Sequence, residues 1–233
     1  MNIERSFTKA LHDFSMAEAG DRILIGASGG KDSLALSFLF SRYAGRRGRD
    51  ISLFALKVRN REIEGAPDPG REARLKKLYE SWGIPLEFTD APAPAESRPE
   101  KNGCFRCASL RRKAVMDFAV RNSMNKIAFG HHLDDILTTF LMNMAGRGNG
   151  SAMKAVRKYD GFGVALIRPL VYVPEESIRR FAAVREWSAA ACTCPQGTGG
   201  LRSLYRERLE TLCGSSLEAK RRMLAVLISE GKV

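Results

Sequence analysis

The sequence lacks the features that mark membrane, secreted and disulfide-stabilised proteins. No apolar run approaches the roughly 20 residues that a helix needs to span a bilayer. Residues 1–6 contain no charged segment followed by an apolar stretch, so no secretory signal is visible and we expect a cytoplasmic protein. Only five of the 233 residues are cysteines. A chain of this length buries about 70% of the surface that its unfolded form exposes, so it needs no disulfides to hold a core.

Acidic residues are scarce relative to basic ones. The chain has 38 lysines and arginines against 26 aspartates and glutamates, which gives a net charge of +12 and a pI near 9.8. This surplus favours a polyanionic partner, with nucleic acid as the first candidate, over a generally basic protein without such a partner. Arginine suits phosphate because it donates two parallel hydrogen bonds. The candidate RNA-binding residues are Arg111, Arg112, Arg147, Arg157 and Arg202.

Short apolar runs alternate with segments of helical periodicity along the chain. The runs predict buried strands at residues 22–27, 51–58, 86–89, 126–130 and 165–168. Helical spacing predicts helices at residues 3–18, 31–43, 69–82, from Cys107 to about 122, 133–144, 174–186, and two more between 200 and 232. The alternation predicts an α/β fold, doubly wound, with a mostly parallel sheet and helices on both faces.

The same pattern predicts three parts and one ligand-binding edge. We expect an N-terminal helix in residues 1–20, an α/β domain in residues 21–190, and a short helical C-terminal extension with a cysteine motif in residues 191–233. Parallel sheets bind ligands at the carboxyl ends of their strands. The loops after Ala27, Val58 and Gly130 should therefore line one crevice.

A turn with two glycines, residues 28–33 (Ser-Gly-Gly-Lys-Asp-Ser), follows the first predicted strand and opens a helix. We call it the glycine turn. Its glycines let the backbone turn tightly and aim N–H groups outward, while the helix N-terminus adds partial positive charge. Two hydroxyls and the Lys31 ammonium complete a site for an anion such as phosphate. The spacing fits neither the P-loop nor the dinucleotide fingerprint, and a turn that binds nothing is the alternative.

Residues 130–135 (Gly-His-His-Leu-Asp-Asp) form a second strand-to-helix junction, which we call the His–Asp junction. The simpler interpretation of Asp134 and Asp135 is that they cap the helix, because carboxylates are favoured at a helix N-terminus. Carboxylates also bind Mg²⁺ together with triphosphate oxygens, and we expect Asp32, Asp134 and Asp135 to do so. His131 and its neighbour can neutralise charge on an α-phosphate.

The cysteines form two close pairs. Cys104 and Cys107 make a CxxC motif ahead of a basic helix, and Cys192 and Cys194 follow some 85 residues later. In a reducing compartment such pairs are more often metal ligands or redox groups than disulfides. Four thiolates suit zinc and three suit an iron–sulfur cluster with one open iron, and spacing alone does not decide between them. We expect Cys213 to be a buried apolar thiol.

The glycine turn resembles the PP-loop of the ATP pyrophosphatase superfamily, whose members cleave ATP between its α and β phosphates. Further motifs stand in the same order as in the TtcA-like tRNA 2-thiocytidine synthetase family, and the resemblance covers roughly residues 5 to 210. They are residues 16–32, the CxxC motif with Leu110-Arg111-Arg112, residues 126–135, residues 141–144 and residues 167–173. The resemblance implies an adenine nucleotide alpha hydrolase-like fold, with residues 21–190 as the PP-loop ATP-binding domain.

The resemblance further implies ATP-dependent transfer of sulfur to tRNA. In that family ATP adenylates the C2 oxygen of a cytidine, and sulfur then displaces AMP. A [4Fe–4S] cluster on three cysteines carries the sulfur, which implies Cys104, Cys107 and Cys194 as ligands, with Cys192 as the alternative third. These cysteines and Asp32 are the implied catalytic residues. The residues implied to contact ATP or pyrophosphate are Ala27, Ser28, Gly29, Gly30, Lys31, Asp32, Ser33, Val58, Gly130, His131 and Asp135.

One position departs from the family, and two other functions stay open. Thr138 stands where the family has an acidic residue. One alternative is a lysidine-synthetase-like ligase that uses ATP without sulfur and carries a structural Zn²⁺. The other is a non-catalytic nucleic-acid-binding zinc protein. The expected partners are tRNA and a sulfur donor such as a cysteine desulfurase or free sulfide. A second copy of the chain is a further candidate, because a short chain offers little area to grip a tRNA.

Overall fold

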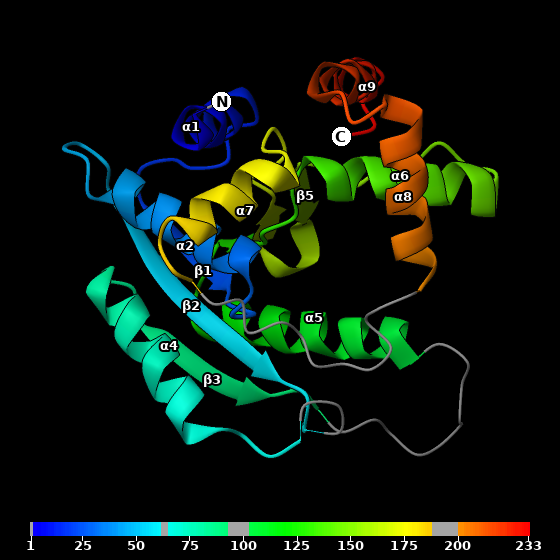
Figure 1. Ribbon diagram of the computed structural model, residues 1–233. Coiled ribbons are helices and arrows are strands. Elements are labelled where there is room, and N and C mark those ends of the chain that lie inside the picture. The colour runs from blue at the N-terminus through cyan, green and yellow to red at the C-terminus, as the bar shows by residue number, and fades with distance from the viewer. Residues whose placement is uncertain (1, 62–64, 93–102, 188–199) are drawn as a thin grey trace.

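A mostly parallel sheet forms the centre of the molecule (Figure 1). The computed structural model describes residues 2–61, 65–92, 103–187 and 200–233, without the side chains of residues 103–107. Within these ranges six strands lie in the order β3-β2-β1-β4-β6-β5. The strands are β1 (Asp21–Gly26), β2 (Ile51–Arg59), β3 (Leu86–Asp90), β4 (Lys126–Ala128), β5 (Val156–Tyr159) and β6 (Val164–Ile167). The α-helices are α1 (Ile3–Asp13), α2 (Lys31–Ala44), α4 (Pro69–Ser81), α5 (Gly103–Arg121), α6 (Leu133–Arg147), α7 (Glu175–Ala183), α8 (Leu201–Cys213) and α9 (Leu217–Ser229).

The sheet changes its direction of growth beside β1. The chain first builds β1, β2 and β3 as parallel neighbours, and then crosses through α5 to place β4 on the other side of β1. Ile25 in β1 is thus in register with Ala55 of β2 and with Ala128 of β4. Ligands of open α/β sheets bind at such a switch point, where the loops that follow the two central strands lie next to each other.

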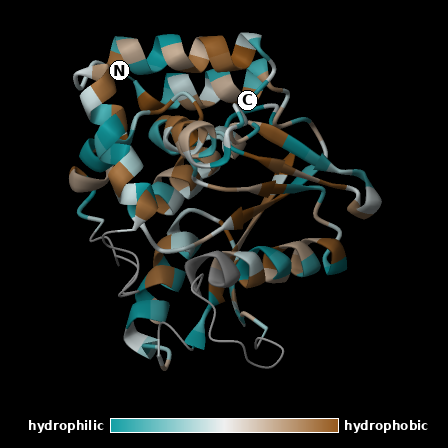
Figure 2. Cartoon of the chain, turned by 90° about the vertical axis from the view of Figure 1, so that its right-hand side faces the viewer, coloured by the Kyte–Doolittle hydropathy of each residue, from teal (hydrophilic) through white to brown (hydrophobic). Residues whose placement is uncertain are grey.

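Each face of the sheet buries its own apolar cluster. α5 covers one face, where Val115 and Ala119 pack against Leu24 and Ile127. α2, α6 and α7 cover the other face, which contains the larger cluster around Ile25. Figure 2 shows the apolar residues in brown along the strands and polar residues in teal on the outer helix surfaces. The prediction of a mostly parallel sheet with helices on both faces is confirmed.

The C-terminal helices α8 and α9 pack against α6. Tyr205, Leu209 and Cys213 recur every fourth residue of α8 and are buried in the larger cluster. The prediction that Cys213 is a buried apolar thiol is confirmed, and its Sγ lies 3.6 Å from Sδ of Met223 in α9. The apolar contacts of α8 are therefore sufficient to dock this helix on the α/β domain.

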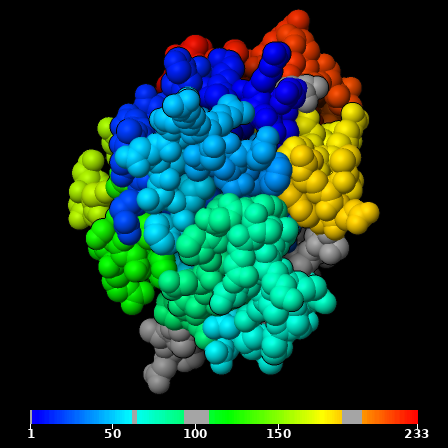
Figure 3. Space-filling model, turned by 90° about the vertical axis from the view of Figure 1, so that its left-hand side faces the viewer, coloured from blue at the N-terminus to red at the C-terminus, as the bar shows by residue number. Residues whose placement is uncertain are grey.

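Short polar side chains fix where α1 and α4 begin. The Asn2 side chain accepts hydrogen bonds from the N–H groups of the first turn of α1, including that of Glu4 at 2.9 Å. Asp68 does the same for α4, which also has Pro69 at its first position. α4 forms much of the face shown in Figure 3. The Tyr79 hydroxyl of this helix is buried and accepts a hydrogen bond of 2.8 Å from Ser37 in α2.

Three helices, α1, α6 and α7, end at other residues than the periodicity predicts, and α7 ends at Ala183 rather than at residue 186. α1 ends at Asp13 rather than near residue 18, because Ser15 turns the chain with a left-handed φ of 48°. α6 continues to Arg147, three residues beyond the predicted end. It ends at Gly148, which has a left-handed φ of 63°. Many helices end with a residue in this conformation, and glycine adopts it without strain.

Two further differences concern β5 and α5. The sequence analysis missed β5, which pairs antiparallel with β6 at the edge of the sheet. β5 is short and half-exposed and contains Arg157 and Lys158, so it offers no apolar run to recognise. α5 begins at Gly103 and not after Cys107, so the CxxC motif lies within this helix and not ahead of it. Among the helices in the described ranges, none combines the length and apolar character that crossing a membrane requires.

Candidate active site

The glycine turn connects β1 to α2 at the switch point of the sheet. The hydroxyl of Ser33 accepts hydrogen bonds from the Gly29 N–H at 3.1 Å and from the Ser28 hydroxyl at 3.0 Å. It also donates one of 2.9 Å to the Gly30 carbonyl. Gly29 has a φ of +83°, a conformation that side chains with a Cβ rarely adopt. The hydroxyls thus hold the turn closed, and glycine makes its geometry accessible.

The His–Asp junction lies in direct contact with the glycine turn. A Cβ placed on Gly130 would lie 3.0 Å from the carbonyl carbon and oxygen of Asp32 and 3.2 Å from the Ser33 nitrogen. A Cβ on Gly26 would lie 2.6 Å from the ring of Phe129. Only glycine permits these approaches, so the two strand-to-helix junctions meet as the topology predicts.

His132 is buried among three carboxylates. Its Nε2 lies 3.3 Å from Asp135 Oδ2 and 3.9 Å from Asp32 Oδ1, and its Nδ1 lies 3.6 Å from Asp134 Oδ2. Asp135 also accepts a hydrogen bond of 3.2 Å from the His132 N–H at the start of α6. Asp135 therefore caps α6, and it approaches the same nitrogen of the His132 ring as Asp32 does.

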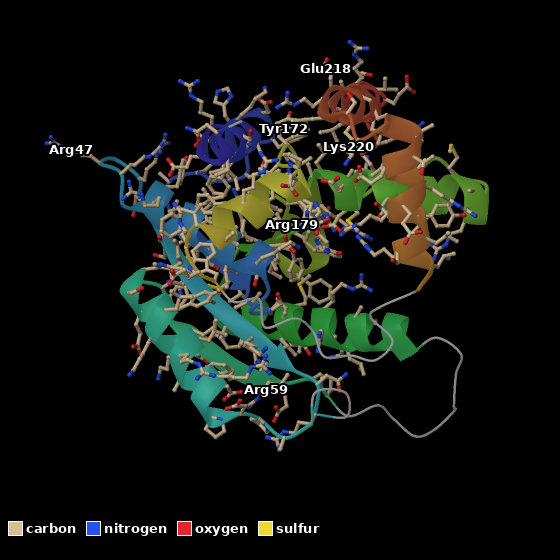
Figure 4. All side chains as sticks on the ribbon, in the orientation of Figure 1. Arg47, Arg59, Tyr172, Arg179, Glu218 and Lys220 are labelled. Carbon is tan, nitrogen blue, oxygen red and sulfur yellow. The ribbon has the colours of Figure 1, made fainter. Side chains whose placement is uncertain are left out.

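Asp134 connects three helices. Its Oδ2 accepts the N–H of Glu175 in α7 at 2.7 Å, and its Oδ1 lies 2.8 Å from Lys220 Nζ in α9. The side chain of Lys220 points from α9 toward α6 (Figure 4). Its Nζ also lies 2.5 Å from Glu210 Oε1 in α8. Burial acts to raise the pKa of Asp134, but hydrogen bonds to His132 and Lys220 outweigh it and hold that pKa well below its usual range. Asp134 is thus ionised, and both of its oxygens have partners.

Lys31 of the glycine turn lies between two carboxylates. Its Nζ is 3.1 Å from Asp32 Oδ1 and 3.0 Å from Glu175 Oε1. Burial acts to lower the pKa of Lys31, but the charges of Asp32 and Glu175 outweigh it and raise that pKa. Glu175 was not expected here, because an acidic residue in the first turn of a helix is usually explained by the helix dipole alone.

Two arginines of α8 bind Asp135. Arg202 and Arg206 lie 3.0 and 2.9 Å from Asp135 Oδ1, and Arg206 also lies 2.7 Å from Glu175 Oε2. Burial acts to raise the pKa of Asp135, but His132 and Arg202 outweigh it and lower that pKa to about 2. The sequence analysis assigned Arg202 to RNA and did not single out Arg206. The available signal was their spacing of four residues, which places both on one side of a helix.

His131 is largely enclosed and stays neutral. Burial, and then the positive charge of Arg168, lower the pKa of His131 to about 4. Its ring meets Phe129 edge to face, with centroids 5.9 Å apart. Burial also lowers the pKa of Arg168 to about 10, and repulsion from Arg157 and Arg112 adds to this effect. Arg157 of β5 and Arg112 of α5 therefore lie near Arg168, which follows β6 and in turn lies near His131.

The end of β2 adds a residue that the sequence analysis missed. Lys57 donates a hydrogen bond of 3.1 Å from Nζ to the carbonyl of Ser28. Val58, the expected contact of ATP, follows it and packs at the edge of the smaller apolar cluster. Ala27 is buried beneath the glycine turn, and its N–H donates to Leu56 of β2 at 2.9 Å. Lys57 would have been a candidate had the predicted strand ends been searched for cations.

The remaining predicted residues lie on α5 and α6 or outside the described residues. Arg147 is exposed at the end of α6, Arg111 is half-buried on α5, and Thr138 is completely buried inside α6. Cys104 and Cys107 lie in the first turns of α5, and their side chains are outside the description. The predicted ligands Cys192 and Cys194 also lie outside the described residues. Among the residues that are described, no group of three or more histidine, cysteine, aspartate or glutamate side chains is arranged to hold a metal ion.

Comparison with known proteins gives the family of the chain. Residues 1–189 match the PP-loop domain. A tRNA-cytidine(32) 2-sulfurtransferase of Bdellovibrio bacteriovorus is 33% identical over 216 residues, which cover 91% of this chain and 80% of that protein. One from Pelobacter propionicus is 34% identical over 209 residues, which cover 88% of this chain and 75% of that protein. This chain belongs to the PP-loop tRNA-cytidine(32) 2-sulfurtransferase family. Within this family member, α8 and α9 lie beyond the residues that match the PP-loop domain.

Solved structures show the same PP-loop fold. The U34-tRNA thiolase NcsA from Methanococcus maripaludis, solved with its [4Fe–4S] cluster, matches with a TM-score of 0.78 and 24% identity. This match covers 97% of the present chain and 78% of that one. The NH3-dependent NAD synthetase from Campylobacter jejuni matches with a TM-score of 0.51 and 12% identity, over 99% of this chain and 95% of that one. At these identities the likeness concerns the architecture alone, and it confirms the predicted α/β fold.

Proposed function

We propose that this protein is an ATP-dependent tRNA sulfurtransferase that replaces the C2 oxygen of a cytidine by sulfur. The observation that carries the proposal is the contact between the glycine turn and the His–Asp junction at the switch point, in a member of this family. The relatives named tRNA-cytidine(32) 2-sulfurtransferase support the substrate and the reaction. Oxide is a poor leaving group, and adenylation makes the oxygen part of AMP, which leaves readily when sulfur attacks.

The glycine turn is the part of the site that binds the β and γ phosphates. The serine hydroxyls hold the turn closed. The N–H groups of the first turn of α2, which no side chain caps, and the Lys31 ammonium offer hydrogen bonds and charge to the departing pyrophosphate. Lys57 holds the Ser28 carbonyl and so orients the start of the turn. ATP binding in this arrangement aligns the α-phosphate with the His–Asp junction.

Asp32 and Asp135 are the residues that would hold Mg²⁺. Both carboxylates lie within 4 Å of Nε2 of His132, beside the glycine turn, and carboxylate oxygen is the donor that Mg²⁺ prefers. When bound, Mg²⁺ neutralises charge on the triphosphate. The expectation that Asp134 shares this role is replaced, because Lys220 and the Glu175 N–H already engage its oxygens. Asp134 instead orders α6, α7 and α9 around the site.

His131 contributes a neutral ring. With a pKa of about 4 it is uncharged at pH 7, so it can donate a hydrogen bond to an α-phosphate oxygen without bringing a counter-charge. Its position next to the contact between Gly130 and Asp32 supports this role.

Cys104, Cys107 and Cys194 would hold a [4Fe–4S] cluster, with Cys192 as the alternative third ligand. Cys104 and Cys107 form a CxxC motif in the first turns of α5, which supports the proposal. The likeness to a thiolase solved with such a cluster also supports it. When bound, the cluster supplies an open iron for sulfur. The sulfur donor, whether a cysteine desulfurase or free sulfide, and a second copy of the chain stay predictions.

The arginines near Arg168 form the surface on which tRNA would approach. Arg112 and Arg157 are exposed and lie close enough to lower the pKa of Arg168. Clustered arginines bind the phosphate backbone, and the target base must leave its stack to reach the reacting centre. Arg111 on α5 and Arg147 on α6 are further predicted contacts of RNA.

Pyrophosphate release tests the proposal most simply. Protein purified without oxygen is mixed with ATP and tRNA, and we expect pyrophosphate to form only when tRNA is present. Lys31→Ala should abolish the release, whereas Lys113→Ala, which removes an exposed lysine of α5, should not change it. Absence of tRNA-dependent pyrophosphate from the wild-type protein would refute adenylation. Pyrophosphate release with incorporation of an amine instead of sulfur would indicate the lysidine-synthetase-like alternative.

A further inference from the structure

α8 brings two arginines to the site from outside the residues that match the PP-loop domain. Arg206 donates to Glu175 Oε2 at 2.7 Å and to Asp135 Oδ1 at 2.9 Å. Arg202, one helical turn earlier, donates to the same oxygen of Asp135 at 3.0 Å. α8 begins at Leu201, whereas the matched domain ends at residue 189. A helix that follows the domain in sequence therefore contributes charge to the site of the domain.

Cations and carboxylates alternate across this site. Glu175 accepts Lys31 on one oxygen at 3.0 Å and Arg206 on the other at 2.7 Å. Asp135 pairs with both Arg206 and Arg202, and Asp32 pairs with Lys31. Three cations are thus matched by three carboxylates. Guanidinium groups pair with carboxylate and phosphate through the same geometry, so phosphate oxygens can replace the carboxylates at each cation.

Other residues of α8 also attach this helix to the domain. The buried residues Tyr205, Leu209 and Cys213 dock this helix, and Lys220 joins it to α6 through Glu210. The side chains of Arg202 and Arg206 stay 46% and 32% exposed, so a ligand in solvent can reach them. Their position beside Lys31 and Asp135 is therefore available for binding.

We propose that Arg206, assisted by Arg202, binds phosphate oxygens of ATP in exchange for Glu175 and Asp135. In the free protein one carboxylate, that of Glu175, holds Lys31 on one oxygen and Arg206 on the other. The exchange frees Asp135, whose oxygens would then be available to Mg²⁺. No covalent bond changes in this step. The inference rests on the proposed function, because it names further residues that bind the same nucleotide.

The experiment compares ATP, pyrophosphate and adenosine as ligands of the full chain by calorimetry. Arg206→Ala should weaken binding of ATP and pyrophosphate about tenfold to hundredfold, which is the usual effect of losing a hydrogen bond to a charged group. Adenosine binding should not change. Arg208→Ala is the matched control, because it removes an exposed arginine of the same helix that stacks on Tyr205 at 5.0 Å. Arg206→Lys should recover part of the lost affinity.

Two results separate the inference from the proposed function. If Arg206→Ala binds ATP as tightly as the wild type while Lys31→Ala does not, the inference is wrong and the proposed nucleotide site stands. Equal loss of adenosine and ATP binding in Arg206→Ala would assign the residue a structural role and also overturn the inference. If the wild-type protein binds neither ATP nor pyrophosphate, the proposed function itself fails.

Discussion

Replacing Lys220 by methionine should destabilise the protein strongly, although the residue lies in the last helix. Its side chain is only 9% exposed and pairs at 2.8 Å with that of Asp134, which is 4% exposed. Methionine keeps a long apolar side chain but removes the charge. Asp134 then keeps the N–H of Glu175 and loses its cation.

The magnitude follows from the burial of this pair. Removing one partner of a buried ion pair costs about 3–5 kcal/mol. The hydrogen bond from Glu175 places the loss at the lower end, at about 3 kcal/mol. For a chain of this size each kcal/mol lowers the melting temperature by about 2–4 °C, so we expect a decrease of about 6–12 °C.

The pH dependence of this difference has a defined sign. In the folded state the pKa of Asp134 is lowered from its ordinary value of 3.8, and the pKa of Lys220 is raised from 10.5. The carboxylate therefore stabilises the fold above pH 3.8 and the ammonium below pH 10.5. The wild type should exceed Lys220→Met in stability by a constant amount between these two pH values, and by less beyond them.

Thermal and urea unfolding of the full chain measure the effect. Arg222→Met is the control, because this residue of the same helix is 79% exposed and should change the free energy of unfolding by no more than about 0.5 kcal/mol. Asp134→Asn combined with Lys220→Met should recover part of the loss, since no charge is then left buried. Equal stability of Lys220→Met and Arg222→Met would refute the reasoning.

Further predictions concern the junctions, the neutral histidine and the cysteines. Gly130→Ala places a methyl group 3.0 Å from the Asp32 carbonyl and should slow pyrophosphate release about tenfold, whereas Gly161→Ala meets no atom within 4 Å and should leave the rate unchanged. The pKa of His131 is about 4 in the folded state, against 6.5 when unfolded, so the unfolded chain binds protons better and stability falls from pH 7 to pH 4. Urea unfolding should show that the free energy of unfolding falls by about 2–3 kcal/mol less in His131→Asn than in the wild type between pH 7 and pH 4. Protein purified without oxygen should contain about four iron atoms per chain, fewer in the Cys104→Ala variant, and a colourless zinc protein would contradict the cluster.

The sequence predicts the centre of the fold well, because the signals there are local. β1 and β4 are short apolar runs followed directly by glycine and a helix, and this pattern also identifies the glycine turn and the His–Asp junction. Their contact follows from the rule for switch points, without knowledge of any side-chain distance. β5 could not be found in the same way, because an exposed edge strand with basic residues has no apolar alternation.

The charge network of the site could not be predicted from the sequence. Glu175 lies 144 residues from Lys31, Arg206 lies 71 residues from Asp135, and Lys220 lies 86 residues from Asp134 along the chain. Each has a local explanation as a helix dipole partner or a solvated face. Only the packing of α7 on α2, and of α8 and α9 on α6, brings them together. Asp134 is an example. Its place at a strand-to-helix junction suggested a metal ligand, whereas the packing of α9 brings Lys220 to its carboxylate.

Analysis of nucleosides in tRNA tests the central claim most directly. Mass spectrometry of tRNA from a strain without this gene should show no 2-thiocytidine. The modified nucleoside should return with the wild-type gene and stay absent with Lys31→Ala. An unchanged amount of 2-thiocytidine in the strain without the gene would contradict the account.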